Sequence, residues 1–80
     1  MLPSIHHPRY VVLRTHLRAL RRAAGLTQTQ LAERLSIDQS YLSKIERGER
    51  YVDILLYLDW YRHCGVEPNH AVSELIDAGV

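Results

Sequence analysis

Residues 27–48, TQTQLAERLSIDQSYLSKIERG, constrain the fold of this chain more than any other stretch. Thr27 precedes an apolar run and Gln30 follows three positions later, a pattern that caps the start of a helix. A short break at residues 36–38 comes next, and Asp38 is a suitable cap for a second helix. Gly48 is free to adopt a positive φ and can end that helix. The stretch therefore predicts two short helices joined by a tight turn.

Two helices this short are not stable alone in water, so a larger body must support them. Leu42 and Ile45 are three positions apart in the second helix and are expected to face that body. The polar positions fall together on the opposite face. They are Gln39, Ser40, Ser43, Lys44 and Arg47. This amide, hydroxyl and cationic face contains no carboxylate and suits the DNA major groove, although any solvent-exposed helix has a polar face.

The stretch resembles the helix-turn-helix of the lambda-repressor-like, XRE-type transcriptional regulators. The resemblance is carried by GLTQ at residues 25–28, by Ala32 in mid-helix and by IERG at residues 45–48. It extends over about residues 13–68. It implies an all-α fold, a compact bundle of about five helices that binds double-stranded DNA. One departure is Ser36, because the family often has glycine at this turn, where glycine relieves a left-handed backbone.

Together with this resemblance, the polar face assigns candidate roles to individual residues. The residues expected to contact bases are Gln39, Ser40, Ser43 and Lys44. The residues expected to contact phosphates are Gln28, Arg47 and Arg50. The resemblance also implies that Arg21 pairs with Glu46 and ties the first helix to the base-contacting helix. The alternative is that both are solvated surface charges of little energetic value.

Charge is distributed unevenly along the chain. The formal net charge is only +1, which by itself does not indicate a nucleic-acid partner. Residues 1–50 contain nine basic and four acidic side chains, a net charge of +5, whereas residues 51–80 carry a net charge of −4. The sequence therefore predicts a basic end that attracts phosphates and an acidic end turned away from them.

The amino-terminal residues are expected to form a flexible arm, residues 1–9, ahead of a single domain at residues 10–80. Two prolines and the lack of a helical period indicate the arm, and the first helix is expected over residues 10–24. The adjacent pair His6 and His7 lacks the fixed spacing of a zinc site. No metal and no cofactor are expected.

Two further helices are expected, over residues 53–64 and 68–78. In the first, Leu56, Trp60 and Cys64, with flanking Tyr57 and Tyr61, are expected to close the core, and further apolar residues occupy a second side. The residues expected at a dimer or partner interface are Ile54, Leu55, Leu58, Val72, Leu75 and Ile76. Packing within the chain is the alternative use of these residues.

Several function classes have no support in the sequence. The single Cys64 rules out an internal disulfide, and no run is apolar enough to span a membrane, so a reducing cytoplasm is the expected setting. No catalytic constellation is present, and the chain is too short to enclose an ordinary substrate pocket. We therefore expect a non-enzymatic, sequence-specific DNA-binding regulator, a repressor that binds an inverted repeat as a homodimer. The alternative is an antitoxin or adaptor that binds a partner protein.

Overall fold

The computed structural model describes residues 4–80. These residues form five α-helices and no β-strand. The helices are α1 (Pro8–Ala23), α2 (Gln28–Leu35), α3 (Gln39–Glu46), α4 (Ile54–His63) and α5 (Pro68–Asp77). The all-α architecture predicted from the sequence is confirmed.

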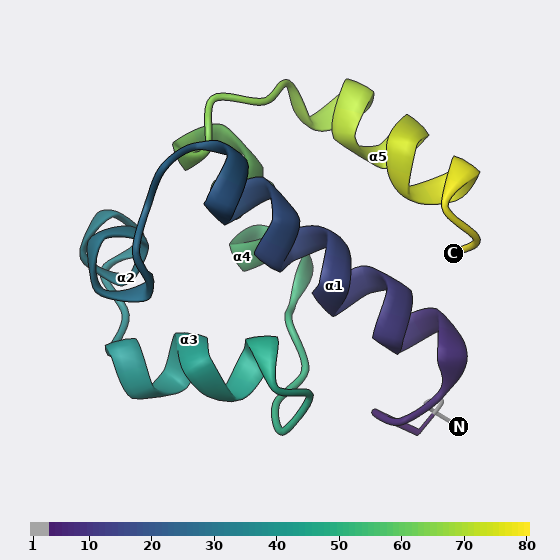
Figure 1. The fold of residues 1–80 in the computed structure, drawn as a ribbon, viewed down its shortest axis with the longest axis horizontal. Helices are drawn as coiled ribbons and strands as arrows, with labels where there is room; N and C mark the ends of the chain where they lie inside the picture. The colour runs from purple at the N-terminus through teal and green to yellow at the C-terminus, as the bar shows by residue number, and fades with distance from the viewer. Residues whose placement is uncertain (1–3) are drawn as a thin grey trace.

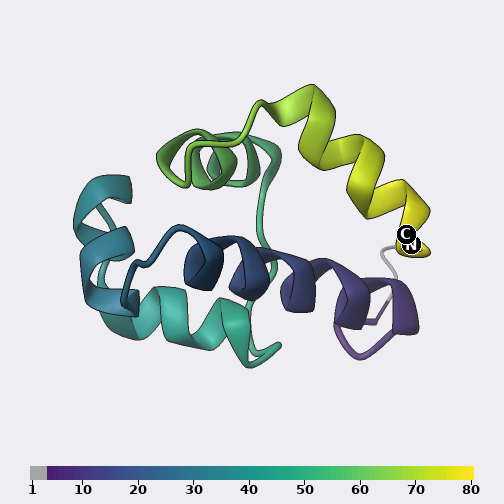
Figure 2. The ribbon, with the colours of Figure 1, turned by 45° about the horizontal axis from the view of Figure 1, so that its top comes forward.

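The longest helix, α1, lies at the centre of the arrangement (Figure 1). It packs against α3 on one side and against α4 and α5 on another, and Figure 2 shows α3 and α5 on opposite sides of it. Helix α2 contacts both α3 and α4. One side of α3 therefore rests on the body of the molecule, and its other side faces solvent. The acidic carboxy-terminal helix lies away from that surface.

Helix α1 begins at Pro8, earlier than the predicted start near Tyr10. Proline is favourable in the first turn of a helix because no intrahelical N–H bond is lost there. The ring Nδ1 of His7 accepts a hydrogen bond from the Arg9 amide at 3.2 Å and caps the helix. Residues 8 and 9 are thus helical and not part of an arm. The described part of the predicted arm is a turn at residues 5–7, and residues 1–3 lie outside the described residues.

Both ends of α2 have a local cause. Thr27 Oγ1 accepts from the Gln30 amide at 3.1 Å, and Gln30 Oε1 accepts from the Thr27 amide at 2.9 Å, which confirms the predicted capping box. The helix ends at Ser36, whose φ of 57° and ψ of 40° are left-handed. Ser36 is the residue that departs from the glycine often found at this turn.

We expect Ser36→Gly to raise the free energy of unfolding by about 0.5–1 kcal/mol. A left-handed conformation costs an L-residue about 1–2 kcal/mol, and the entropy that glycine loses on folding offsets part of that gain. Urea unfolding would measure the change. Ser73→Gly, in the exposed interior of α5, is the matched control and should lower stability. A loss of stability in both variants would contradict the assignment of strain to Ser36.

The core-facing side of α4 agrees with the prediction at Trp60 and its flanking tyrosines and differs at Leu56 and Cys64. Tyr57, Trp60 and Tyr61 are buried, whereas Leu56 and Cys64, which were expected to face the core, are only partly buried. Because α4 is contacted by α1, α2 and α5, large rings fill the space between three neighbours. The Trp60 indole Nε1 donates to the Leu17 carbonyl oxygen at 3.0 Å, which satisfies its only polar group.

Candidate nucleic-acid interface

Helix α3 is held against the body by its apolar side and by its carboxy-terminal end. Leu42 and Ile45 are buried, as their spacing predicted. Asp38 occupies the cap position, but its side chain accepts no hydrogen bond from the helix start, contrary to expectation. Gly48 follows with a φ of 79°, and a Cβ there would lie 2.5 Å from Arg14 Cζ. Gly48 is therefore favoured by its backbone conformation, whereas the guanidinium of Arg14, at the end of a flexible side chain, could move aside.

The outer side of α3 presents the polar groups predicted to contact DNA. Gln39 and Ser40 are exposed at the amino-terminal end, and Ser43 and Lys44 are half-buried one turn further on. The carboxylate of Glu46 belongs to the same helix but is turned inward, with no exposed side-chain surface. The exposed side of α3 can therefore offer amide, hydroxyl and ammonium groups to base edges without carboxylate repulsion.

Two cations predicted to contact phosphates lie just beyond this helix. Arg47 and Arg50 are exposed in the segment that follows α3. Arg47 Nε lies 2.6 Å from Glu49 Oε2, so part of its charge is neutralised locally. Arg50 Nη1 donates to the Glu49 carbonyl oxygen at 3.4 Å. With the half-buried ammonium of Lys44, these groups give this end of the surface its positive charge.

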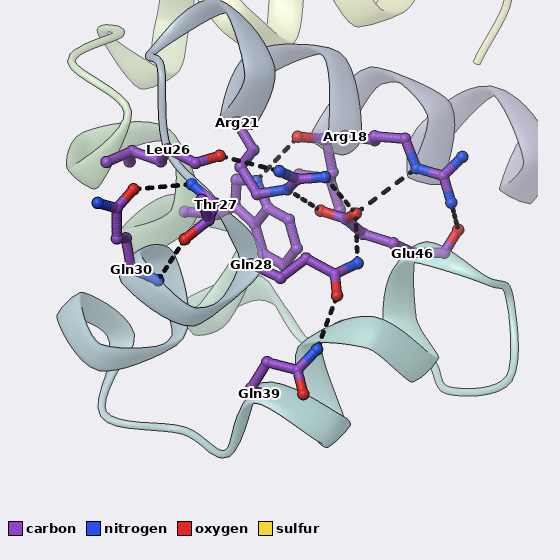
Figure 3. A network of polar contacts seen from close by, with 10 residues as sticks. Arg18, Arg21, Leu26, Thr27, Gln28, Gln30, Gln39 and Glu46 are labelled. Atoms are coloured by element: carbon purple, nitrogen blue, oxygen red, sulfur yellow. Dashed lines mark hydrogen bonds and ion pairs between the residues drawn. The ribbon is translucent and has the colours of Figure 1, made fainter.

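The structure pairs Arg21 with Glu46, as the resemblance implied. Arg21 Nε donates to Glu46 Oε2 at 2.8 Å and Arg21 Nη2 donates to Glu46 Oε1 at 3.0 Å (Figure 3). The third donor, Arg21 Nη1, bonds the Leu26 carbonyl oxygen at 2.9 Å. Both side chains are almost entirely buried. These three hydrogen bonds link α1 to the residue before the α2 cap and to the last residue of α3.

Arg18 is a second cation at the same carboxylate and was not predicted. Its Nε lies 3.5 Å from Glu46 Oε1, and its Nη2 donates to the Glu46 carbonyl oxygen at 3.0 Å. Burial on its own would raise the pKa of Glu46. Hydrogen bonds from Arg21 and Gln28, with the charges of Arg21 and Arg18, outweigh burial and lower this pKa below its ordinary value. Glu46 is therefore ionised in the folded protein at neutral pH.

Gln28 was predicted to contact phosphate, and the structure gives its side chain two protein partners. Gln28 Nε2 donates to Glu46 Oε1 at 3.1 Å, and Gln28 Oε1 accepts from Gln39 Nε2 at 2.8 Å (Figure 3). The sequence feature that could have indicated this contact is that both glutamines are the first residues of consecutive helices. Their contact depends on the crossing of α2 and α3, which the sequence pattern did not define.

A family model described as a helix-turn-helix domain matches residues 12–75. The chain belongs to this helix-turn-helix family. The helix-turn-helix consists of α2, the turn at Ser36 and α3. The match also includes α4 and most of α5, so the supporting helices are part of the family fold.

Two solved structures show the same fold over nearly the whole helix-turn-helix chain. An XRE-family like protein from Pseudomonas syringae pv. tomato str. DC3000 is 39% identical, with a TM-score of 0.83, covering 95% of this chain and 93% of that one. The clp gene regulator ClgR from Corynebacterium glutamicum is 26% identical, with a TM-score of 0.78. The match covers 95% of this chain and 79% of that one. No functionally curated protein matches the sequence. The identity and coverage of the Pseudomonas syringae protein show that this helix-turn-helix chain belongs to the XRE family.

The six apolar residues predicted to form one interface lie in different places in this XRE-family protein. Leu75 is only 5% exposed and packs in the chain's own core, so the prediction is corrected for this residue. Leu58 is partly buried against the same core. Leu55 lines a hollow with Tyr41 at the amino-terminal start of α3, whereas Ile54 lines another with Leu75. Val72 and Ile76 are exposed and share one face of α5.

One histidine of the adjacent pair considered as a zinc site has a structural role in this XRE-family protein. His7 caps α1, and His70 Nε2 lies 3.0 Å from Glu74 Oε1 on the surface of α5. Across residues 4–80, no three histidine, cysteine or acidic side chains are arranged to hold a metal ion. Within the same residues, none of the helices combines the length and apolar character needed to cross a bilayer.

Proposed function

We propose that this XRE-family protein is a transcriptional regulator that binds a specific double-stranded DNA sequence through α3. The observation that carries the proposal is the rigid support of one polar helix face. The buried pair of Arg21 and Glu46 ties α3 to α1, while Gln39, Ser40, Ser43 and Lys44 remain on the solvent side. The similarity to an XRE-family like protein and to a clp gene regulator supports a regulatory role.

Base and phosphate contacts are divided along this surface. Gln39, at the start of α3, is suited to bond adenine through its amide, and Lys44 is suited to donate to guanine. Ser40 and Ser43 can bond to either donors or acceptors. Arg47 and Arg50 follow the helix and are placed to bond phosphates, which positions the protein without selecting a sequence. Gln28 contributes by holding Gln39.

A single α3 helix contacts too little DNA for a specific site. Its eight residues span about 12 Å, the length of roughly four base pairs. The domain measures 31 × 26 × 19 Å, so two copies side by side can place their α3 helices about 34 Å apart, one turn of DNA. We propose a homodimer that binds an inverted repeat through Val72 and Ile76 of α5, with Ile54 at the edge, and represses transcription by excluding polymerase from the promoter.

Selection of bound sequences from a random double-stranded DNA pool, near physiological salt, tests this function. At that salt, nonspecific attraction to phosphates is weakened, so enrichment reports base recognition. An inverted repeat with half-sites one helical turn apart would support both the DNA contact and the dimer. Folded protein that enriches no sequence would contradict the proposed function.

Substitutions at Lys44 and Arg50 should separate base contacts from phosphate contacts. We expect Lys44→Ala to weaken cognate binding by about 1–3 kcal/mol and to relax the preference at its base pair. Arg50→Ala should weaken all sequences alike and reduce the slope of log affinity against log salt by about one. Titrations of cognate and scrambled duplexes at several salt concentrations measure both effects. Unchanged discrimination in Lys44→Ala would contradict the assigned base-contacting face.

Binding to a partner protein is the second candidate function. It is favoured by Leu55, which is 71% exposed beside a hollow lined by Ile37 and Tyr41. Exposed apolar groups gathered at a hollow are typical of interaction surfaces. An antitoxin or adaptor role becomes the preferred function if the random-pool selection fails, and the surface around Leu55 is then the one to map.

A further inference from the structure

The residues ahead of α1 fold back along that helix and are held by Arg14. Arg14 Nη1 donates to the Ile5 carbonyl oxygen at 3.0 Å, although the two residues are nine positions apart in the sequence. The turn itself is closed by the His7 amide, which donates to the Ser4 carbonyl oxygen at 2.9 Å. Both ribbon views place this turn on the same side of α1 as α3 (Figure 1, Figure 2). One arginine of α1 therefore holds the amino-terminal turn on the side of the molecule that carries α3.

The same guanidinium lies against the glycine that follows α3. The backbone of Gly48 approaches it so closely that a Cβ there would lie 2.5 Å from Arg14 Cζ and 2.6 Å from Arg14 Nη1. Within residues 4–80, no carboxylate lies within ion-pair distance of Arg14, so no acid draws the guanidinium elsewhere. Arg14 therefore joins the amino-terminal turn to the start of the loop between α3 and α4.

This loop depends on side-chain contacts for its position. Residues 50–53 belong to no helix. Within the described chain, the amides of Arg50 and Val52 donate no hydrogen bond to a backbone carbonyl. Tyr51 packs edge-to-face against Tyr10 of α1, with the two ring centroids 5.0 Å apart. Packing on α1 therefore contributes more to the position of this loop than backbone hydrogen bonds do.

We call Ile5, Tyr10 and Arg14 the amino-terminal brace. All three line one small space together with Gly48 and Arg50. The volume of this space is about 10 Å³, at the lower limit for a single water molecule, so the brace and the loop are closely packed. Arg50 itself is exposed and is the cation proposed to bond phosphate. Its protein side is thus supported by α1 and by the amino-terminal turn.

We infer that the amino-terminal brace positions Arg50 for its phosphate contact, with Arg14 as the central positioning residue. A loop that must become ordered on binding loses conformational entropy, and a loop already held in place avoids part of that cost. Phosphate contacts carry no sequence information, so the brace should affect the affinity for every DNA sequence alike. This inference rests on the proposed function and assigns a role in DNA binding to residues outside the helix-turn-helix.

Arg14→Met tests the brace because it removes the hydrogen bond to Ile5 and keeps an unbranched side chain. We expect the affinities for cognate and scrambled duplexes to fall alike, by about two- to tenfold near physiological salt. The slope of log affinity against log salt should decrease by about one, as in Arg50→Ala. Titrations of both duplexes at several salt concentrations measure these effects. A loss confined to the cognate duplex would overturn the inference.

A double variant distinguishes positioning from direct contact. If Arg14 acts through Arg50, adding Arg14→Met to Arg50→Ala should lower the affinity no further. A further loss would mean that Arg14 bonds phosphate itself, which would overturn its role as a positioning residue.

Two single variants separate the brace from the charge that Arg14 carries. Tyr10→Ala removes the ring that contacts Tyr51 without changing the net charge, and it should lower the affinity for both duplexes as Arg14→Met does. Arg9→Met removes an exposed charge from the same end of α1 and should change the affinity little. Equal losses in Arg9→Met and Arg14→Met, with none in Tyr10→Ala, would show that net charge alone matters and would overturn the brace.

Backbone ¹⁵N relaxation of residues 48–52 provides a measurement without DNA. We expect these residues to be ordered in the free wild type and more mobile in Arg14→Met and Tyr10→Ala, with the backbone of α3 equally ordered in all three proteins. A loop that stays equally ordered in Arg14→Met would overturn the brace even if the protein selects a specific sequence. A loop that loosens as expected in a protein that enriches no sequence would instead show that the proposed function has failed, and the phosphate role of the brace would fail with it.

Discussion

Arg21→Met is expected to lower the free energy of unfolding by about 3–5 kcal/mol. The substitution removes two hydrogen bonds to Glu46 and one to the Leu26 carbonyl oxygen, and leaves a carboxylate that is fully buried. Arg18, partly exposed at 3.5 Å, compensates only in part. A loss of this size is a large share of the stability of a small domain. Urea unfolding followed by far-UV circular dichroism measures it.

The chain offers a matched control in its exposed Arg–Glu pair. Arg47 Nε lies 2.6 Å from Glu49 Oε2, but both side chains are more than half exposed. Arg47→Met should therefore change the free energy of unfolding little. Replacing Arg21 and Glu46 together with methionine should recover much of the loss, since no unpaired charge is then buried. Equal losses in Arg21→Met and Arg47→Met would contradict the role assigned to burial.

The same pair makes stability depend on pH. The pKa of Glu46 is lowered by folding, so its stabilisation is complete above the ordinary value of 4.5 and is lost as pH falls through the lower folded value. The difference in stability between the wild type and Arg21→Met should therefore narrow as pH falls, and should be smallest below the lowered pKa of Glu46, because Glu46 is then neutral in both proteins. A difference that stays constant down to acid unfolding would contradict an ionised Glu46 in the native state.

Features that depend on neighbouring residues in the chain could be predicted from the sequence. The capping box of Thr27 and Gln30 and the end of α3 at Gly48 follow from backbone groups within a few residues. The start of α1 was misplaced because proline signals both a break and a first helical turn, and only the cap from His7 separates the two.

Features that depend on how helices cross could not be predicted in this way. Leu56 and Cys64 are only partly buried, while the flanking tyrosines are buried, because the rotation of α4 is determined jointly by three neighbouring helices. The pattern placed Leu75 on an apolar face but could not say that α1 and α4 would cover it. The contact of Gln28 with Gln39 likewise requires the angle between α2 and α3. Assignment of Arg21 to Glu46 depended on the family resemblance, since both are charged residues without a local pattern.

Ile76→Asp is expected to lower affinity for an inverted-repeat duplex by about 10²–10⁴-fold without unfolding the domain. Ile76 is 61% exposed on α5, so the monomer loses little buried surface. In the proposed dimer the new carboxylate would be buried beside its copy, and like charges would oppose association. The two half-sites would then be bound independently, and the gain from linking them would be lost. Fluorescence anisotropy with full-site and half-site duplexes measures this change.

Leu55→Asp is the control for this experiment, because Leu55 is also exposed but lines the hollow beside Tyr41 on a different side of α4 from Ile54. A dimer formed through α5 predicts that Ile76→Asp is monomeric in sedimentation and retains half-site affinity, whereas Leu55→Asp remains dimeric. A monomeric Leu55→Asp with a dimeric Ile76→Asp would instead assign the interface to the hollow at Leu55. A twofold contact there would bring Asp38 and Asp59, which also line the hollow, close to their copies. Electrostatic repulsion there would weaken a symmetric dimer, so we expect the α5 face to be the one that dimerises.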